Sequence, residues 1–289
     1  MDGAPSGGRG APRGALGLSD IFSGQGVDEA VLAEIYDLEH DEITEDLAFY
    51  REWARRVPGA VIDLGCGSGR LFPALIDGGA RRLVGVDGSA ALIERARARV
   101  EADERLRAVA ERGALELDLA DVRRVTRRDR FALAVLAGVI AHLDGPEDAV
   151  RALTCARRLL EPGGVLIVDM LGPGALPPHD LPLSIDWERE MSGSRVVRRS
   201  RLTCRKVPEG MRVEYVTLTD LARADGTIAR LPASFRLWYP SPDALIGLAA
   251  EAELAVEATY GSHDLDPLDD GSERFIMVLR GAATESGMG

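Results

Sequence analysis

Short strand-like runs alternate with helical runs between residues 61 and 170, and this alternation constrains the fold more than any other feature of the sequence. The apolar, β-branched runs are VIDLG, LVGVD, ALELD, FALAVLA and VLIVDM. Helical patterns occupy residues 69–77, 89–100 and 146–160. Strands that alternate with helices pair in parallel through right-handed crossovers. The sequence therefore predicts an α/β fold built on an open, doubly wound sheet.

The chain before the first strand divides into two parts. Residues 25–57 carry apolar side chains at helical spacing up to Pro58 and Gly59, which predicts N-terminal helices, two in number. The first 22 residues are rich in glycine, proline and alanine and lack the continuous apolar segment of a secretory signal. We therefore expect a disordered tail at residues 1–22 and a single domain at residues 23–289.

A different pattern interrupts the alternation after residue 175. Three β-like runs, SRVVRRSRLTCRKV, MRVEYVTLTDLA and TIARLPASFRLWY, follow one another with turn residues between them and no helical period. They predict an antiparallel β-meander inserted at residues 175–240. A helix at residues 241–252 and two further strands, LAVEATYG and ERFIMVLR, then complete the domain.

The charge of the chain excludes some classes of partner. There are 35 Lys and Arg residues against 47 Asp and Glu residues, a formal net charge of −12 at pH 7. This charge repels phosphate backbones and anionic lipids, so we expect no nucleic-acid partner and no membrane. No apolar run approaches the roughly 20 residues of a membrane-spanning helix. The 3 cysteines fit neither a disulfide framework nor a zinc site, which favours a cytoplasmic protein without a metal.

The glycine-rich motif DLGCGSG, residues 63–69, lies at the end of the first predicted strand. It is either a tight turn or a place where a ligand approaches the backbone. Arg70 stands where a dinucleotide fingerprint has its third glycine, which argues against NAD or FAD. Asp87 ends the second strand, where a carboxylate can accept hydrogen bonds from ribose hydroxyls; Asp118 and Leu119 end the third, where they can read an adenine edge. The pattern favours a nucleoside site without a pyrophosphate.

The segments VIDLGCGSGR, LVGVDGS, LDLADV and LLEPGGVLIVD, in this order, resemble the motifs of class I S-adenosylmethionine-dependent methyltransferases. The resemblance covers residues 36–280 and implies a Rossmann-like, seven-stranded sheet with an antiparallel last strand. It implies that the glycines line the methionine moiety, Asp87 holds the ribose, and Asp118 and Leu119 contact the adenine. The cofactor-binding residues carried over in this way are Asp63, Gly65, Cys66, Gly67, Gly69, Asp87, Gly88, Asp118, Leu119 and Ala137. Ala132 departs from the acid that the family often has at the start of the fourth strand.

His142 follows the fourth strand in GVIAHL and is the leading candidate on the acceptor side. It is either a base that activates a hydroxyl or a partly buried residue that caps a turn. The segment IYDLEH at residues 35–40, His142 and the meander resemble small-molecule methyltransferases of natural-product pathways, particularly N-methyltransferases of nucleotide-linked aminosugars. This resemblance implies that Tyr36 and His142 flank the acceptor. Trp187 and Tyr239 complete the predicted acceptor site.

The meander carries Arg199, Arg201 and Arg205 at positions that share one strand face. They form either a clamp for a diphosphate or a solvated outer face. The opposite face carries Tyr215, Phe235 and other apolar side chains, so we expect the meander to form a lid over the acceptor.

Taken together, these patterns predict an S-adenosylmethionine-dependent methyltransferase that acts on a small molecule, with an amino group preferred over a hydroxyl. One alternative is an O-methyltransferase with His142 as the general base. Another is a cofactor-binding protein without methyl transfer, either pericyclase-like or regulatory. The fourth strand lacks the Asn/Asp-Pro-Pro-aromatic signature of enzymes that methylate nucleobases. A monomer and a homodimer both remain open, because exposed meander strands can pair across copies.

Overall fold

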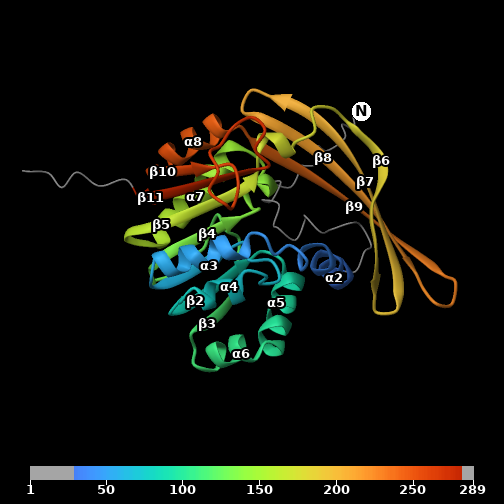
Figure 1. Ribbon diagram of the computed structural model, residues 1–289, viewed down its shortest axis with the longest axis horizontal. Helices are drawn as coiled ribbons and strands as arrows, with labels where there is room; N and C mark the ends of the chain where they lie inside the picture. The colour runs from blue at the N-terminus through green and yellow to red at the C-terminus, as the bar shows by residue number, and fades with distance from the viewer. Residues whose placement is uncertain (1–28, 282–289) are drawn as a thin grey trace, which may run out of the picture.

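The computed structural model describes residues 29–281, so the tail predicted for residues 1–22 lies outside the described residues. At its centre is a seven-stranded sheet with the order β10-β11-β5-β4-β1-β2-β3 (Figure 1). The strands are β1 (Ala60–Leu64), β2 (Arg82–Asp87), β3 (Leu115–Leu119), β4 (Phe131–Ala137), β5 (Leu160–Leu171), β10 (Leu254–Tyr260) and β11 (Arg274–Gly281). Strands β1 to β5 pair in parallel, whereas β11 is antiparallel to both of its neighbours. The predicted seven-stranded, doubly wound sheet with an antiparallel last strand is confirmed.

Helices cover both faces of this sheet (Figure 1). They are α2 (Glu29–His40), α3 (Leu47–Arg56), α4 (Phe72–Asp77), α5 (Ala90–Ala102), α6 (Glu104–Glu111), α7 (Pro146–Leu159) and α8 (Pro242–Glu251). Successive strand residues point to opposite faces, so Val61 packs with α3 to α6 while Ile62 packs with α7 and α8. Burial on both faces explains why the central strands are continuous apolar runs in the sequence.

Helix α6 was not predicted. The sequence indicated one helix ending near Val100, but α5 continues to Ala102 and α6 follows directly. The Asp103 carboxylate caps α6, because it accepts hydrogen bonds from the backbone N–H groups of Arg105 (2.8 Å) and Leu106 (3.2 Å). This local cap turns the chain without a glycine or proline, the signals on which the prediction depended.

The meander stands beside the α/β body as a separate antiparallel sheet (Figure 1). It has four strands where the sequence predicted three: β6 (Leu181–Met191), β7 (Ser194–Val207), β8 (Gly210–Ala222) and β9 (Ile228–Pro240). Strand β6 was missed because most of its side chains are exposed, so it lacks the apolar alternation of a half-buried strand. The base of the meander packs on the body through Val213 and Trp238, and α2 packs on β7 and β8 through Leu32 and Ile35.

Two short 3₁₀ helices, η1 (Ile140–His142) and η2 (Pro173–Ala175), follow β4 and β5. Within residues 29–281, no helix is long and apolar enough to span a membrane.

Candidate active site

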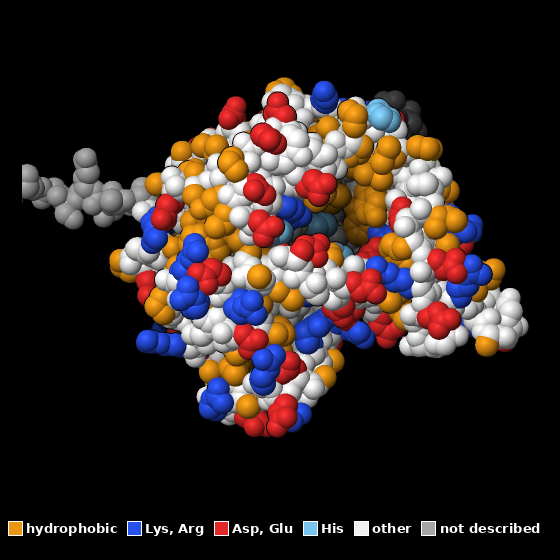
Figure 2. All heavy atoms as spheres, viewed as in Figure 1, with side chains coloured by type: hydrophobic (Ala, Val, Ile, Leu, Met, Phe, Trp, Pro, Cys, Tyr) orange, Lys and Arg blue, Asp and Glu red, His pale blue; other side chains and the backbone are white. Residues whose placement is uncertain are grey.

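A cavity of about 700 Å³ lies between the carboxyl ends of the parallel strands, helix α2 and one face of the meander. This is within the usual size range of small-molecule sites, and the strand ends of a doubly wound sheet are where such sites form. Figure 2 shows the hollow between the body and the meander, with histidine and arginine side chains inside it and acidic side chains beside its opening.

The glycine-rich loop forms one wall of this cavity. Gly65 and Cys66 donate backbone hydrogen bonds to Val86 O at 2.7 and 2.9 Å, which fixes the loop to β2. Gly67 has φ of +56°, and a Cβ atom there would lie 2.7 Å from Tyr36 Oη. The loop therefore needs glycine at residue 67 both for its backbone conformation and for the close approach of α2.

Asp87 ends β2 and reaches the same wall. Its two carboxylate oxygens accept hydrogen bonds from Gly67 N (2.9 Å) and Ser89 N (2.8 Å). Burial raises the pKa of this carboxyl, and the hydrogen bonds from Ser89, Gly67 and Gly88 act in the opposite direction. These backbone donors hold Asp87 in place, and its carboxylate keeps acceptor capacity for a further donor.

Asp63 lies beneath the loop and is fully enclosed, with 1% of its surface exposed. Its Oδ2 atom has no hydrogen-bond partner. Burial, and secondly the charge of Asp87, raise the pKa of Asp63 to about 7, although Arg70 lowers it in part. Asp63 does not itself line the cavity, but its neighbours Asp87 and Arg70 do, and a buried acid with an unpartnered oxygen is suited to a cationic neighbour.

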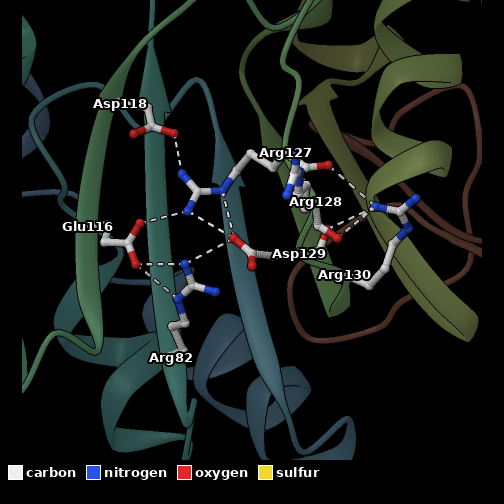
Figure 3. Close-up of polar contacts among 7 residues, drawn as sticks. All are labelled: Arg82, Glu116, Asp118, Arg127, Arg128, Asp129 and Arg130. Carbon is white, nitrogen blue, oxygen red and sulfur yellow. Dashed lines mark hydrogen bonds and ion pairs between the residues drawn. The ribbon is translucent and has the colours of Figure 1, made fainter.

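Asp118 and Leu119 lie outside the lining of the cavity. Figure 3 shows the Asp118 carboxylate paired with the Arg127 guanidinium, which also contacts Glu116 (2.6 Å) and Asp129 (3.1 Å). The Leu119 side chain is 57% exposed, although its backbone is in register with Asp87. Any adenine contact by Asp118 would have to compete with this ion-pair network.

The remaining residues of the predicted cofactor set lie in or around the same wall. Gly69 has φ of +80°, and Phe72 packs against it. Ala137 lines the cavity at the end of β4. Cys66 is buried, which raises the pKa of its thiol, and Gly88 follows Asp87 directly.

Tyr36 and His142 line the same cavity from α2 and η1. The Tyr36 ring stacks on His40 with centroids 4.0 Å apart, and burial followed by the charge of Asp87 raises the pKa of its phenol. Enclosure of the imidazole, and secondly the neighbouring His40, lower the pKa of His142 to about 4. His142 is therefore neutral and weakly basic at neutral pH. His40, which also lines the cavity, was not singled out from the sequence.

Trp187 and Tyr239, the other predicted acceptor residues, do not line the cavity. Trp187 donates its indole N–H to Glu39 Oε1 (3.1 Å) in the contact between β6 and α2. Tyr239 shares a strand face with Phe235 and Leu237, which do line the cavity, but the end of β9 packs onto the body and buries it there.

The structure adds a cluster that sequence analysis did not assign, centred on Asp169 at the end of β5. Asp169 accepts a hydrogen bond from Tyr50 Oη (2.6 Å), lies 2.8 Å from His263 Nε2, and pairs with Arg274, whose Nε is 3.0 Å away. The sequence signal that could have identified Asp169 as a site residue was its position at the end of a predicted strand. His263 and Arg274 come from the C-terminal loop and β11, and no local pattern links them to β5.

Arg198 on β7 is the second addition. It is 6% exposed, pairs with Glu39 through Nη1 and donates to Tyr215 Oη (2.9 Å) through Nη2. Because strand side chains alternate, the predicted row of Arg199, Arg201 and Arg205 occupies the opposite face and does not line the cavity. Within residues 29–281, no group of three or more His, Cys, Asp or Glu side chains is placed to hold a metal ion.

The chain is similar to known methyltransferases. Residues 61–164 match the model of a family described as a methyltransferase domain. The fold resembles the sugar N-methyltransferase KedS8 from Streptoalloteichus sp., with 25% identity, a TM-score of 0.60, and 96% of this chain and 100% of that chain covered. It also resembles the CcbJ methyltransferase from Streptomyces caelestis, with 22% identity, a TM-score of 0.66, and 87% and 96% covered. DesVI from Streptomyces venezuelae has 19% identity, a TM-score of 0.66, and 89% and 99% covered.

None of the curated proteins compared with this chain matches it. The segment matched by the family model contains the glycine-rich loop, Asp87 and His142, and the solved structures extend the likeness through the meander to β11. Residues 61–164 therefore form a methyltransferase domain, within a chain that has the fold of these solved methyltransferases.

Proposed function

We propose that this enzyme methylates an amino group of a small molecule. The observation that carries the proposal is the position of His142 in the cavity wall, where burial lowers its pKa to about 4 and makes it a weak base. A hydroxyl acceptor needs a base near the oxygen, whereas an amine reacts as its free base without one. The similarity to a sugar N-methyltransferase over nearly the whole chain supports the same assignment.

The residues of the loop wall fit the cofactor. Asp87 has acceptor capacity left for a ribose hydroxyl, and the unpartnered Asp63 oxygen suits the positive charge of the methionine end. The absence of a side chain at Gly67 lets Tyr36 of α2 approach the loop closely. S-adenosylmethionine supplies a methyl group on a sulfonium, and its transfer to a neutral amine moves one positive charge from sulfur to nitrogen.

Tyr36 and His142 would orient the acceptor amine. The raised pKa of Tyr36 keeps its phenol protonated, and the neutral imidazole of His142 can accept an N–H hydrogen bond from the amine. Both groups line the same cavity, so they can align the amine nitrogen with the methyl group, and this alignment supplies most of the rate enhancement. No proton acceptor is required in this step, because the product leaves as a methylammonium ion.

Formation of S-adenosylhomocysteine with a panel of acceptors tests the proposal. We expect turnover with primary or secondary amines and little with matched alcohols or phenols. Turnover of phenols alone would identify an O-methyltransferase. A product formed without S-adenosylhomocysteine would identify the non-methylating alternative.

Replacement of His142 separates an orienting role from a base role. We expect His142→Gln to lower kcat for an amine acceptor by less than about tenfold, because Gln keeps a hydrogen-bond acceptor and no proton transfer is lost. The kcat profile between pH 6 and pH 8 should keep its shape, since His142 titrates near pH 4. A loss of about 10²-fold or more in kcat would instead indicate general base catalysis.

Asp63 gives cofactor binding a pH dependence of defined sign. With a pKa of about 7, Asp63 is roughly half protonated at neutral pH in the free protein. A cationic ligand group stabilises the carboxylate and lowers this pKa, so binding releases a proton below pH 7. We therefore expect the Kd for S-adenosylhomocysteine, which keeps its ammonium group, to fall about tenfold from pH 6 to pH 8 in calorimetry.

The control for this pH dependence is Asp63→Asn, which removes the titrating group and keeps the side-chain volume. Its Kd should not change between pH 6 and pH 8. An equal slope in Asp63→Asn and the wild type would assign the dependence to another residue.

A further inference from the structure

Among residues 29–281, every arginine that lines the cavity is already paired with a carboxylate. Arg70 forms two hydrogen bonds with Asp46, at 2.7 and 2.6 Å. Arg198 pairs with Glu39, and Arg274 pairs with Asp169. Four further carboxylates of the wall have no matching arginine in it, namely Glu45, Asp87, Asp264 and Glu273. The wall is therefore strongly acidic, and each of its guanidinium charges is balanced by a carboxylate, although the buried Nε of Arg198 has no hydrogen-bond partner.

The pair between Arg198 and Glu39 is the one that borders the meander side of the cavity. Glu39 is fixed there by a second donor, the indole N–H of Trp187 at 3.1 Å. Asp186 adds another negative charge, with its Oδ2 3.8 Å from Arg198 Nε. A phosphate that bound Arg198 would have to lie beside both carboxylates or displace Glu39 from two donors, and like charges held in contact are costly.

The rest of the meander wall offers no replacement for this charge. It carries the uncharged hydroxyl groups of Thr217 and Thr219 and is apolar around Ala233, Phe235 and Leu237, and the arginine row of β7 faces away from it. An apolar wall opposite an acidic one suits an amine carried on an uncharged scaffold.

We propose that the acceptor is an amine on a phosphate-free scaffold, and that Glu39 is the residue that excludes phosphate-bearing acceptors by neutralising Arg198. This inference rests on the proposed N-methylation and narrows its substrate class. It replaces the nucleotide-linked aminosugars that the sequence resemblance implied by aminosugars that carry no phosphate, such as alkyl or aryl glycosides.

A matched pair of acceptors tests this selection. The pair is one aminosugar as an alkyl glycoside and the same aminosugar as a nucleoside diphosphate ester, each measured by S-adenosylhomocysteine formation. We expect the wild type to favour the alkyl glycoside in kcat/KM by at least about tenfold, as expected for one uncompensated like-charge contact. A preference for the diphosphate ester would overturn the proposal.

The variant Glu39→Gln removes the negative charge and keeps an oxygen for the Trp187 indole. It should reduce the preference about tenfold, mainly through a lower KM for the diphosphate ester. The control is Glu42→Gln, which makes the same charge change at an exposed residue that pairs with Arg189 (2.9 Å) outside the cavity wall. An unchanged preference in Glu39→Gln, or an equal change in Glu42→Gln, would also overturn the proposal.

A binding measurement on the complex of the enzyme with S-adenosylhomocysteine compares the wild type with Glu39→Gln without turnover. With a nucleoside diphosphate as the probe in calorimetry, we expect no binding below about 1 mM to the wild type and measurable binding to Glu39→Gln. Binding to the wild type would contradict the exclusion of phosphate. If the binding pattern holds while no amine yields S-adenosylhomocysteine, the proposed N-methylation is wrong and the charge selection stands.

Discussion

Asp169→Ala is expected to lower the free energy of unfolding by about 3 kcal/mol, a larger loss of stability than we expect from any other single substitution in the site. Asp169 is 1% exposed and is the shared partner of Tyr50, His263 and Arg274. Its removal leaves the fully buried Tyr50 hydroxyl and a largely buried guanidinium without an acceptor. Urea denaturation with a constant m-value measures the change.

Two variants calibrate this result. Tyr50→Phe removes one donor and should cost about 1 kcal/mol, whereas Glu111→Ala on an exposed turn of α6 should stay within about 0.5 kcal/mol. The partners of Asp169 lower its pKa below the ordinary 3.8, chiefly through His263 and Arg274 against the opposing effect of burial. Its contribution is therefore complete above about pH 4 and is lost as the pH falls through the lower pKa of the folded state. A loss below about 1 kcal/mol for Asp169→Ala at pH 7 would contradict the shared-partner role.

Asp87→Ala is expected to raise the Kd for S-adenosylhomocysteine at least about 30-fold, or about 2 kcal/mol. The carboxylate is preoriented by Gly67 N and Ser89 N, so the variant removes both the ligand acceptors and the anchor of the glycine-rich loop. Calorimetry on the folded variant measures the affinity, and unfolding without ligand shows whether the loop anchor also affects stability.

Asp87→Asn and Glu94→Ala complete this experiment. The amide keeps one acceptor oxygen and should lose less affinity than Asp87→Ala, while Glu94 is exposed on α5 and its replacement should leave the Kd unchanged. An unchanged Kd in Asp87→Ala would place the ribose elsewhere.

The central sheet could be predicted because each of its strands can be recognised from a short segment of the sequence. Each central strand is a continuous apolar run buried on both faces, and the DLGCGSG turn follows the first of them, so the order of strands and the position of the loop follow from short segments. Strand β6 and helix α6 escaped prediction for the opposite reason. The first has mostly exposed side chains, and the second begins at a capping aspartate that looks like any other surface acid.

The cavity is lined by residues of both predicted sets, which are Gly65, Gly67, Asp87 and Ala137 on the cofactor side and Tyr36 and His142 on the acceptor side. Asp87 and Gly67 lie at strand ends, where the topology of the sheet alone brings residues together. Arg198 reaches the cavity because its face of β7 turns inward, which depends on how the meander docks on the body. His263 reaches the cavity from the C-terminal loop. Arg199 directly follows Arg198 but lies on the opposite face of β7, because a shift of one position along a strand moves a side chain to the other face.

Helix α2 carries Tyr36 against Gly67 of the loop and, one turn later, Glu39 against Arg198 of the meander. Because a helix is rigid over one turn, Tyr36 and Glu39 move together. The position of α2 therefore affects both the cofactor side and the acceptor side of the cavity. A ligand that displaced this helix on one side would alter the other side as well, and thermodynamic reciprocity requires that each ligand then change the binding of the other by the same factor. A single turn of helix therefore contacts both parts of the site.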